Sequence, residues 1–141
     1  MLYILDTDHI SLLQHRDVRV ITNMKRVSFT LRAVTVVSLA EQIQGRLAVI
    51  SKAKTEVDAG RAFQRLYETN EFYRTVQVLF YDEPAIQAFE RLRHQKVRIG
   101  TQDLRIAAIA LSLSATVITR NLRDFRQVPG LIVEDWSTLS S

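Results

Sequence analysis

The chain has 141 residues, of which 47% are hydrophobic, so it is long and apolar enough for one domain with a buried core. Its formal net charge of +4 favours a polyanionic partner such as RNA or DNA. The absence of cysteine excludes disulfides, thiolate nucleophiles and Cys-ligated zinc, which leaves oxygen and histidine as the ligands for any metal.

Apolar segments alternate with amphipathic ones along the chain. Strands are expected at 2–5, 33–37, 76–80, 116–119 and 131–133. Helices are expected from a cap at Thr7 or Asp8, from Asp17, from a cap at Ser38, over 55–73, from Asp82 and from about Thr101. This order predicts one α/β domain over 1–141, with three layers and a central, mainly parallel sheet flanked by helices.

Two of these helices have predicted inner faces. The helix that starts at Asp17 is expected to bury Val18, Ile21 and Met24. The long helix over 55–73 is expected to have Val57, Leu66 and Tyr67 inside. No apolar segment has the length of a membrane span, and Asp6 comes too early for a secretory signal, so we expect a cytoplasmic protein.

Acidic and amide side chains follow the predicted strands. Asp6, Glu41, Asn121 and Asp124 each come within a few residues of a strand, and Asp103 begins a helix that could face the same edge. In open α/β sheets, ligands bind beyond the carboxyl ends of the strands. Carboxylates that converge there repel one another, and oxygen-only ligands favour Mg²⁺ or Mn²⁺ as the compensating cation.

Several of these acids also have purely structural interpretations. Glu41 could complete a capping box with Ser38, Asp103 could favour a helix start capped by Thr101, and Asp124 could be an ordinary turn residue. Asp6 is harder to explain in this way, because a carboxylate at the end of a buried strand is costly unless it is paired or bound. The three histidines, His9, His15 and His94, have no metal-ligand spacing and are expected at the surface or on helix sides.

Four segments together carry a family resemblance: "YILDTDHISLL", "VVSLAEQIQGRL", "RIGTQDLRIAAIAL" and "VITRNLRDFRQVPGLIVEDW". In this order they resemble PIN-domain ribonucleases, and closely the VapC toxins of bacterial toxin–antitoxin pairs. The resemblance implies a homodimeric, Mg²⁺- or Mn²⁺-dependent endoribonuclease that a small antitoxin encoded beside it holds inactive. It also implies that Asp6, Glu41 and Asp103 are metal ligands.

The resemblance leaves the fourth acidic position open between Asn121 and Asp124, and it places Thr119 in the same pocket. We favour Asp124, because a carboxylate binds Mg²⁺ better than an amide and can act as a base, with Thr119 and Asn121 hydrogen-bonding around it. Asp8 lies near the site without a firm role.

The remaining assignments concern roles and partners. Asp6 and Asp103 are expected to hold the principal ion, while Glu41 ligates it or orients a water molecule as general base. The candidates for contact with the RNA backbone are Arg98, Arg120 and Arg123. The helix over 55–73 and the segment before it are expected to offer the antitoxin an apolar groove.

Two other functions are compatible with parts of the sequence. The pair Asp6 and Asp8 after a strand suggests a haloacid-dehalogenase-like phosphatase, but that mechanism also needs a lysine and a later acidic pair, which have no convincing counterparts here. A non-catalytic RNA-binding or interaction module could use the same fold, but it would not need so many acids at one sheet edge. Metal-dependent cleavage of RNA separates the nuclease from both alternatives.

Overall fold

The computed structural model of the protein describes residues 1–138, so the end of the predicted 1–141 domain lies outside the described residues. Five parallel strands form the central sheet in the order β3-β2-β1-β4-β5. They are β1 (Tyr3–Leu5), β2 (Arg32–Thr35), β3 (Val78–Leu79), β4 (Thr116–Ile118) and β5 (Ile132–Glu134). The predicted parallel α/β fold is therefore confirmed, with β1 at its centre.

Helices connect the strands and cover the sheet. They are α1 (Thr7–Gln14), α2 (Val18–Lys25), α3 (Val36–Lys52), α4 (Glu56–Arg74), α5 (Glu83–His94), α6 (Thr101–Ser112) and α7 (Leu122–Phe125), and a 3-10 turn spans Phe29–Leu31. Among residues 1–138, none of the helices has both the length and the apolar character needed to cross a membrane.

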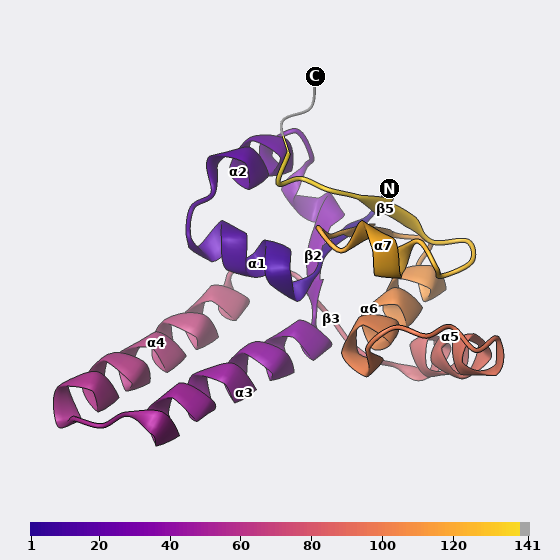
Figure 1. The fold of residues 1–141 in the computed structure, drawn as a ribbon. Coiled ribbons are helices and arrows are strands. Elements are labelled where there is room, and N and C mark those ends of the chain that lie inside the picture. The colour runs from indigo at the N-terminus through magenta and orange to yellow at the C-terminus, as the bar shows by residue number, and fades with distance from the viewer. Residues whose placement is uncertain (139–141) are drawn as a thin grey trace.

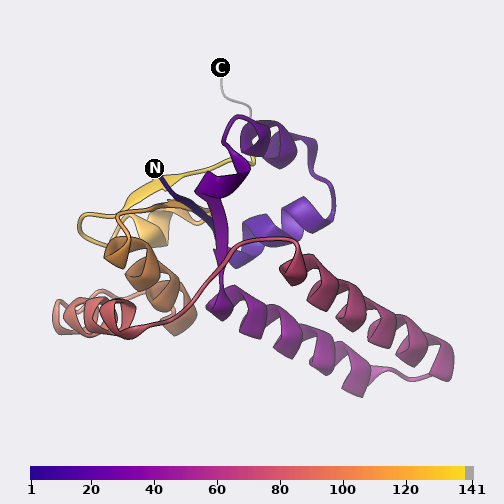
Figure 2. The ribbon, with the colours of Figure 1, turned by 180° about the vertical axis from the view of Figure 1, so that it is seen from behind.

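Successive side chains of the central strands point to opposite faces of the sheet, into two separate hydrophobic cores. Ile4 and Val117 point to one side of the sheet, into the core shared with α5 and α6. Leu5 and Ile118 point to the other side, into a core that includes Ile10 of α1. This alternation produces the three layers visible in Figures 1 and 2.

Helices α3 and α4 form an antiparallel hairpin that projects from the body of the molecule (Figure 1). We call residues 43–74 of this hairpin the helical arm. Val57 and Tyr67 were expected inside, but they are 65% and 59% exposed because the arm has no layer on its outer side. Leu66 is half-buried.

Three other local predictions were wrong. Val18 of α2 was expected inside but is exposed, whereas Ile21 and Met24 are half-buried and Val20 and Asn23 are the buried residues of this helix. The N-cap of α1 is Asp6 rather than Thr7 or Asp8, and α6 begins after Gly100, so Thr101 is its first residue and not its cap.

Candidate active site

Asp6 lies at the carboxyl end of the central strand and starts α1. Its Oδ1 accepts a hydrogen bond of 2.9 Å from the backbone N–H of His9, and its own N–H donates to Ile118 O on β4. The residue is buried, with 4% of its surface exposed. The strand end and the helix start therefore fix one carboxylate in the middle of the sheet edge.

Glu41 is not part of a helix cap. Helix α3 begins at Val36 with Thr35 as its N-cap, whose Oγ1 accepts from the N–H of Ser38. The N-cap Thr35 lies three residues before the predicted cap, Ser38. Glu41 therefore falls in the second turn of α3, out of reach of a capping box. Its Oε1 instead accepts a 2.7 Å hydrogen bond from Thr7 Oγ1 at the start of α1. The carboxylate is thus oriented toward the end of β1.

Asp103, in the first turn of α6, faces the other acids. Its pKa is raised to about 6, mainly because burial disfavours its charged form, and then because Asp6, Glu41, Asp124 and Asp8 repel a further negative charge. Four carboxylates therefore lie close enough to Asp103 to act on its ionisation. The predicted convergence of Asp6, Glu41, Asp103 and Asp124 is present in the fold.

Asn121 and Asp124 were alternatives for the fourth acidic position, but their side chains are hydrogen-bonded to each other. Asn121 Nδ2 donates to Asp124 Oδ2 over 2.9 Å, and the backbone N–H of Asn121 donates to Thr119 Oγ1 over 2.8 Å. Thr119 is fully buried at the end of β4. Thr119 fixes the turn, Asn121 holds the carboxylate, and Asp124 carries the negative charge.

His9 was expected at a surface or on a helix side, but it is fully buried. Its Nε2 accepts a 3.1 Å hydrogen bond from the backbone N–H of Trp136, which places the proton of the neutral ring on Nδ1. That Nδ1 lies 3.4 Å from Asp6 Oδ1. The ring thus connects the segment after β5 to the central carboxylate. The signal in the sequence was the spacing of three residues between Asp6 and His9, which places both on one side of the first helical turn.

The donor chemistry of the acidic residues fits a hard divalent cation. Within residues 1–138, Glu41, Asp103 and Asp124 form no ion pair with a lysine or arginine, so their charges are not compensated by the protein. In the same range, no group of three acidic, histidine or cysteine side chains is already arranged to hold a metal ion. Carboxylate oxygens without cysteine are the ligands that Mg²⁺ and Mn²⁺ prefer. The residues therefore fit such an ion in type and charge.

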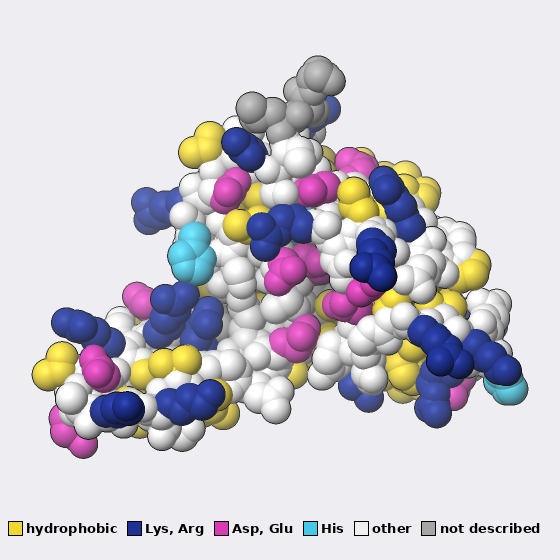
Figure 3. Space-filling model, viewed as in Figure 1, with side chains coloured by type: hydrophobic (Ala, Val, Ile, Leu, Met, Phe, Trp, Pro, Cys, Tyr) yellow, Lys and Arg dark blue, Asp and Glu magenta, His cyan; other side chains and the backbone are white. Residues whose placement is uncertain are grey.

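The three predicted RNA-contacting arginines are all exposed. Arg98 precedes α6, Arg120 follows Thr119 directly, and Arg123 is the neighbour of Asp124 in α7. Figure 3 shows acidic side chains near the middle of this face, with lysine and arginine side chains to both sides of them. This arrangement is compatible with a polyanion laid across the acids, and the RNA contacts stay a prediction.

The structure has a five-stranded parallel sheet with acidic side chains at its carboxyl edge. This is the architecture of the PIN-like nuclease class that the sequence resemblance predicts. No family model matches the sequence. Individual relatives do match: the chain is 32% identical over 143 residues to "Ribonuclease VapC1" of Haemophilus influenzae (strain R2866), covering 97% of this chain and 99% of that protein. The chain belongs to the VapC family of ribonucleases.

Other comparisons agree with this assignment. A segment of 69 residues is 38% identical to "tRNA(fMet)-specific endonuclease VapC" of Salmonella typhimurium, although it spans only 52% of that protein, and a 45-residue match to "Ribonuclease VapC2" of Rickettsia felis spans 34% of it. Two solved structures share the fold. VapBC-1 from nontypeable Haemophilus influenzae has a TM-score of 0.75 at 25% identity, covering 98% of this chain and 100% of the matched chain. DNA-bound VapBC from Salmonella typhimurium has a TM-score of 0.76 at 26% identity, covering 96% and 99%.

Proposed function

We propose that this chain is a Mg²⁺- or Mn²⁺-dependent endoribonuclease, the toxin of a toxin–antitoxin pair. The observation that carries the proposal is the convergence of Asp6, Glu41 and Asp124 on the half-buried Asp103 without a lysine or arginine paired to Glu41, Asp103 or Asp124 within residues 1–138. Such an arrangement costs folding free energy, and a bound divalent ion would offset this cost. Membership of the VapC family of ribonucleases gives the same activity and favours it over the phosphatase alternative.

In this proposal Asp6 and Asp103 hold the ion, which would stabilise negative charge on the phosphate and make water more acidic. Glu41 is the general base, because the hydrogen bond from Thr7 to its Oε1 orients the carboxylate at the end of β1. Asp124, oriented by Asn121, completes the acidic set at its outer side. Arg98, Arg120 and Arg123 bind the RNA backbone, as exposed guanidinium groups can.

The test is incubation of the purified protein with a panel of RNAs in Mg²⁺, Mn²⁺ or EDTA, followed by mapping of the cut ends. One RNA in the panel is tRNA(fMet), since the Salmonella typhimurium relative is named for it. We expect defined cuts with either metal and none in EDTA. Binding of Mn²⁺ is measured separately by calorimetry, with Asp6→Asn as the control that should bind it at least about tenfold more weakly. RNA that stays intact in every condition would support the non-catalytic RNA-binding alternative.

The partners proposed for this chain are a cognate antitoxin and a second copy of itself. The matched solved structures are VapBC complexes, and the helical arm leaves Val57, Phe63 and Tyr67 exposed, which suits an apolar segment of the antitoxin. The homodimer is proposed from the family resemblance, and the cytoplasmic location from the sequence expectation given above. Light scattering on the free protein tests the dimer, which predicts twice the mass of 16.2 kDa.

A further inference from the structure

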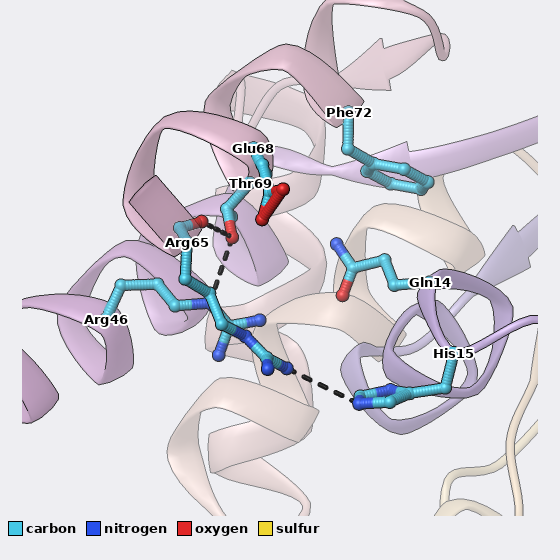
Figure 4. Close-up of a pocket in the computed structure, with 7 residues that line it drawn as sticks. All are labelled: Gln14, His15, Arg46, Arg65, Glu68, Thr69 and Phe72. Carbon is cyan, nitrogen blue, oxygen red and sulfur yellow. Dashed lines mark hydrogen bonds between the residues drawn. The ribbon is translucent and has the colours of Figure 1, made fainter. Parts of the chain in front are cut away.

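A polar pocket lies between α1 and the helical arm, apart from the cluster of acids. It has a volume of about 360 Å³. Its lining residues, labelled in Figure 4, are Gln14, His15, Arg46, Arg65, Glu68, Thr69 and Phe72. We call it the arginine pocket, because the guanidinium groups of Arg46 and Arg65 lie next to each other in it.

Neutral partners hold both guanidinium groups in place. Arg46 Nε donates a 2.9 Å hydrogen bond to Oγ1 of the buried Thr69, which in turn donates to Arg65 O. Arg65 Nη2 lies 3.4 Å from His15 Nε2. In the neutral ring of His15, Nδ1 donates to Ser11 O over 2.7 Å, so Nε2 is free to accept from Arg65. These contacts orient the arginines without neutralising their charge.

The two positive charges have no carboxylate counterpart. Glu68 lines the pocket, but within residues 1–138 neither Arg46 nor Arg65 has a carboxylate oxygen within 4.0 Å. The pKa of Arg46 is lowered, first by burial and then by repulsion from Arg65. A pair of like charges in a partly desolvated pocket is unfavourable, and an anion between them would remove the repulsion. Two guanidinium forks match the oxygens of a phosphate in particular.

Helix α1 connects the acidic site to the pocket. At its start Thr7 donates to Glu41 Oε1 on α3, and at its end Gln14 lines the pocket. Gln42 and Arg46 lie one turn apart on α3, and Gln42 exchanges hydrogen bonds with Gln14 at the pocket wall. Glu41 and Arg46 are five positions apart, about 7.5 Å along the helix axis and about 140° around it. An RNA strand that follows α1 past the acids therefore reaches the arginine pocket.

We propose that the arginine pocket binds a backbone phosphate of single-stranded RNA a few nucleotides from the bond that is cleaved. This inference rests on the proposed ribonuclease function. RNA is favoured over an acidic protein segment because α1 runs from the contact with Glu41 to the pocket wall. In addition, the ring of Phe72, in that wall, offers a face on which a neighbouring base can stack. The contact would contribute affinity and register without reading the sequence.

The test measures RNA binding in EDTA, where the RNA is not cut. A fluorescent single-stranded RNA is titrated with the parent and with Arg46→Gln/Arg65→Gln at several KCl concentrations. We expect the double variant to bind at least about tenfold more weakly and its salt slope, log K against log [KCl], to fall by about 1. Arg61→Gln is the matched control, since Arg61 is also exposed on α4, one turn from Arg65, but does not line the pocket. It should change the affinity by less than about twofold.

A second measurement locates the phosphate. RNAs with one neutral methylphosphonate at successive positions should lose affinity for the parent at one position more than at the others, and the double variant should show no such loss there. Equal affinity of parent and double variant, or the same methylphosphonate profile for both, would overturn the proposal. If Arg46→Gln does not fold, as judged by circular dichroism, Arg65→Gln alone carries the test, because within residues 1–138 the exposed Arg65 side chain hydrogen-bonds only to His15.

The remaining outcomes separate this inference from the others. If RNA affinity is unchanged but an eight-residue polyglutamate peptide binds the parent and not the double variant, the occupant is an acidic protein segment and the RNA proposal is wrong. A parent that binds RNA through the pocket but never cuts it with Mg²⁺ or Mn²⁺ contradicts the proposed function and leaves the pocket assignment standing. A parent that cuts RNA, with a double variant that binds it equally well, contradicts the pocket assignment alone.

Discussion

The helix that carries Asp103 and the second helix of the arm are built in opposite ways. Helix α6 buries six of its twelve residues, including Ile106 and Ile109, between the sheet and α5. Helix α4 buries three of its nineteen residues, and Phe63 and Tyr67 are exposed. The proposed site for chemistry thus includes a residue on a helix that is packed between the sheet and α5, where a side chain keeps its geometry. The helical arm leaves apolar side chains exposed, where a partner chain can cover them.

Each region also has an unmet requirement. At the sheet edge, acidic side chains face one another without a protein cation, which a divalent ion can satisfy. On the arm, the exposed aromatic and aliphatic side chains lack a cover, which a partner chain can supply. Substitutions in one region should therefore change metal binding and cleavage, and substitutions in the other should change partner binding. The following predictions test that separation.

The largest effect is expected for Asp103→Asn. It keeps the shape of the side chain and the covered face of α6 but removes a charge from the acidic cluster. We expect RNA cleavage to fall by about a thousandfold or more, roughly 4 kcal/mol of barrier, while antitoxin binding stays within about twofold. Single-turnover cleavage and calorimetry measure the two. A variant that no longer folds would instead support the interpretation of Asp103 as a structural helix-start residue.

The second prediction concerns the buried ring beside Asp6. His9→Ala leaves a cavity and deprives the N–H of Trp136 of its acceptor, so it should lower the free energy of unfolding by about 2–4 kcal/mol. Urea denaturation measures the change. His94→Ala, at an exposed position at the end of α5, is the control and should stay within about 0.5 kcal/mol. Equal stabilities of the two variants would show that the contact from His9 to Trp136 contributes nothing.

Much of this arrangement could be predicted from the sequence, because buried strands and the acids after them have short-range signals. Asp6 follows an aliphatic run directly and Asp124 comes a few residues after a β-branched one, so their place at the carboxyl edge followed from the strand order alone. The start of α3 could not be predicted in the same way, because Val36 and Val37 have β-branched side chains typical of a strand and yet form the first helical turn.

The contacts made only by tertiary packing were not predictable. The buried state of His9 depends on Trp136, which is 127 residues away along the chain. The hydrogen bond from Arg46 to Thr69 joins two helices whose pairing has no local signal. The exposure of Tyr67 likewise depends on the absence of a further layer over the arm, which the amphipathic pattern of one helix does not reveal.

The third prediction separates the two residues of the α7 turn. Asp124→Ala removes the charge and should lower the cleavage rate by more than about tenfold, with partial rescue at raised Mn²⁺. Asn121→Ala removes only the donor that orients Asp124 and should cost less, about threefold. Steady-state cleavage at several Mn²⁺ concentrations measures both. Parent-like activity of Asp124→Ala together with an inactive Asn121→Ala would assign the fourth position to the amide.

The fourth prediction addresses the arm. Phe63→Ser/Tyr67→Ser removes two exposed aromatic side chains one turn apart on α4. It should weaken binding of the cognate antitoxin by about tenfold and leave RNA cleavage by the free protein unchanged. Val18→Ser, another exposed apolar residue but on α2, is the matched control. Antitoxin binding that survives the double substitution would place the partner elsewhere on the molecule.

The smallest effect is the pH dependence of stability without metal. Asp103 has a pKa of about 6 in the folded protein against an ordinary value of 3.8, so folding favours its protonated form. Its contribution to stability is fully present below about pH 4 and is lost as the pH rises through about 6. The shift corresponds to at most about 3 kcal/mol, and because the group is only partly buried, screening by solvent should reduce this to roughly 1 kcal/mol.

The same shift can be isolated by comparing two proteins in EDTA. At pH 7.5 Asp103→Asn should be more stable than the parent by roughly 1 kcal/mol, and the difference should vanish near pH 4, where the parent is protonated as well. Urea denaturation at both pH values measures it, and contributions from Asp6 and Glu41 largely cancel because both proteins contain them. Added Mg²⁺ should reverse the order at pH 7.5, because it binds the parent more tightly and stabilises it by mass action. A difference that is independent of pH and of Mg²⁺ would mean that the repulsion around Asp103 is too weak to require a cation at the sheet edge.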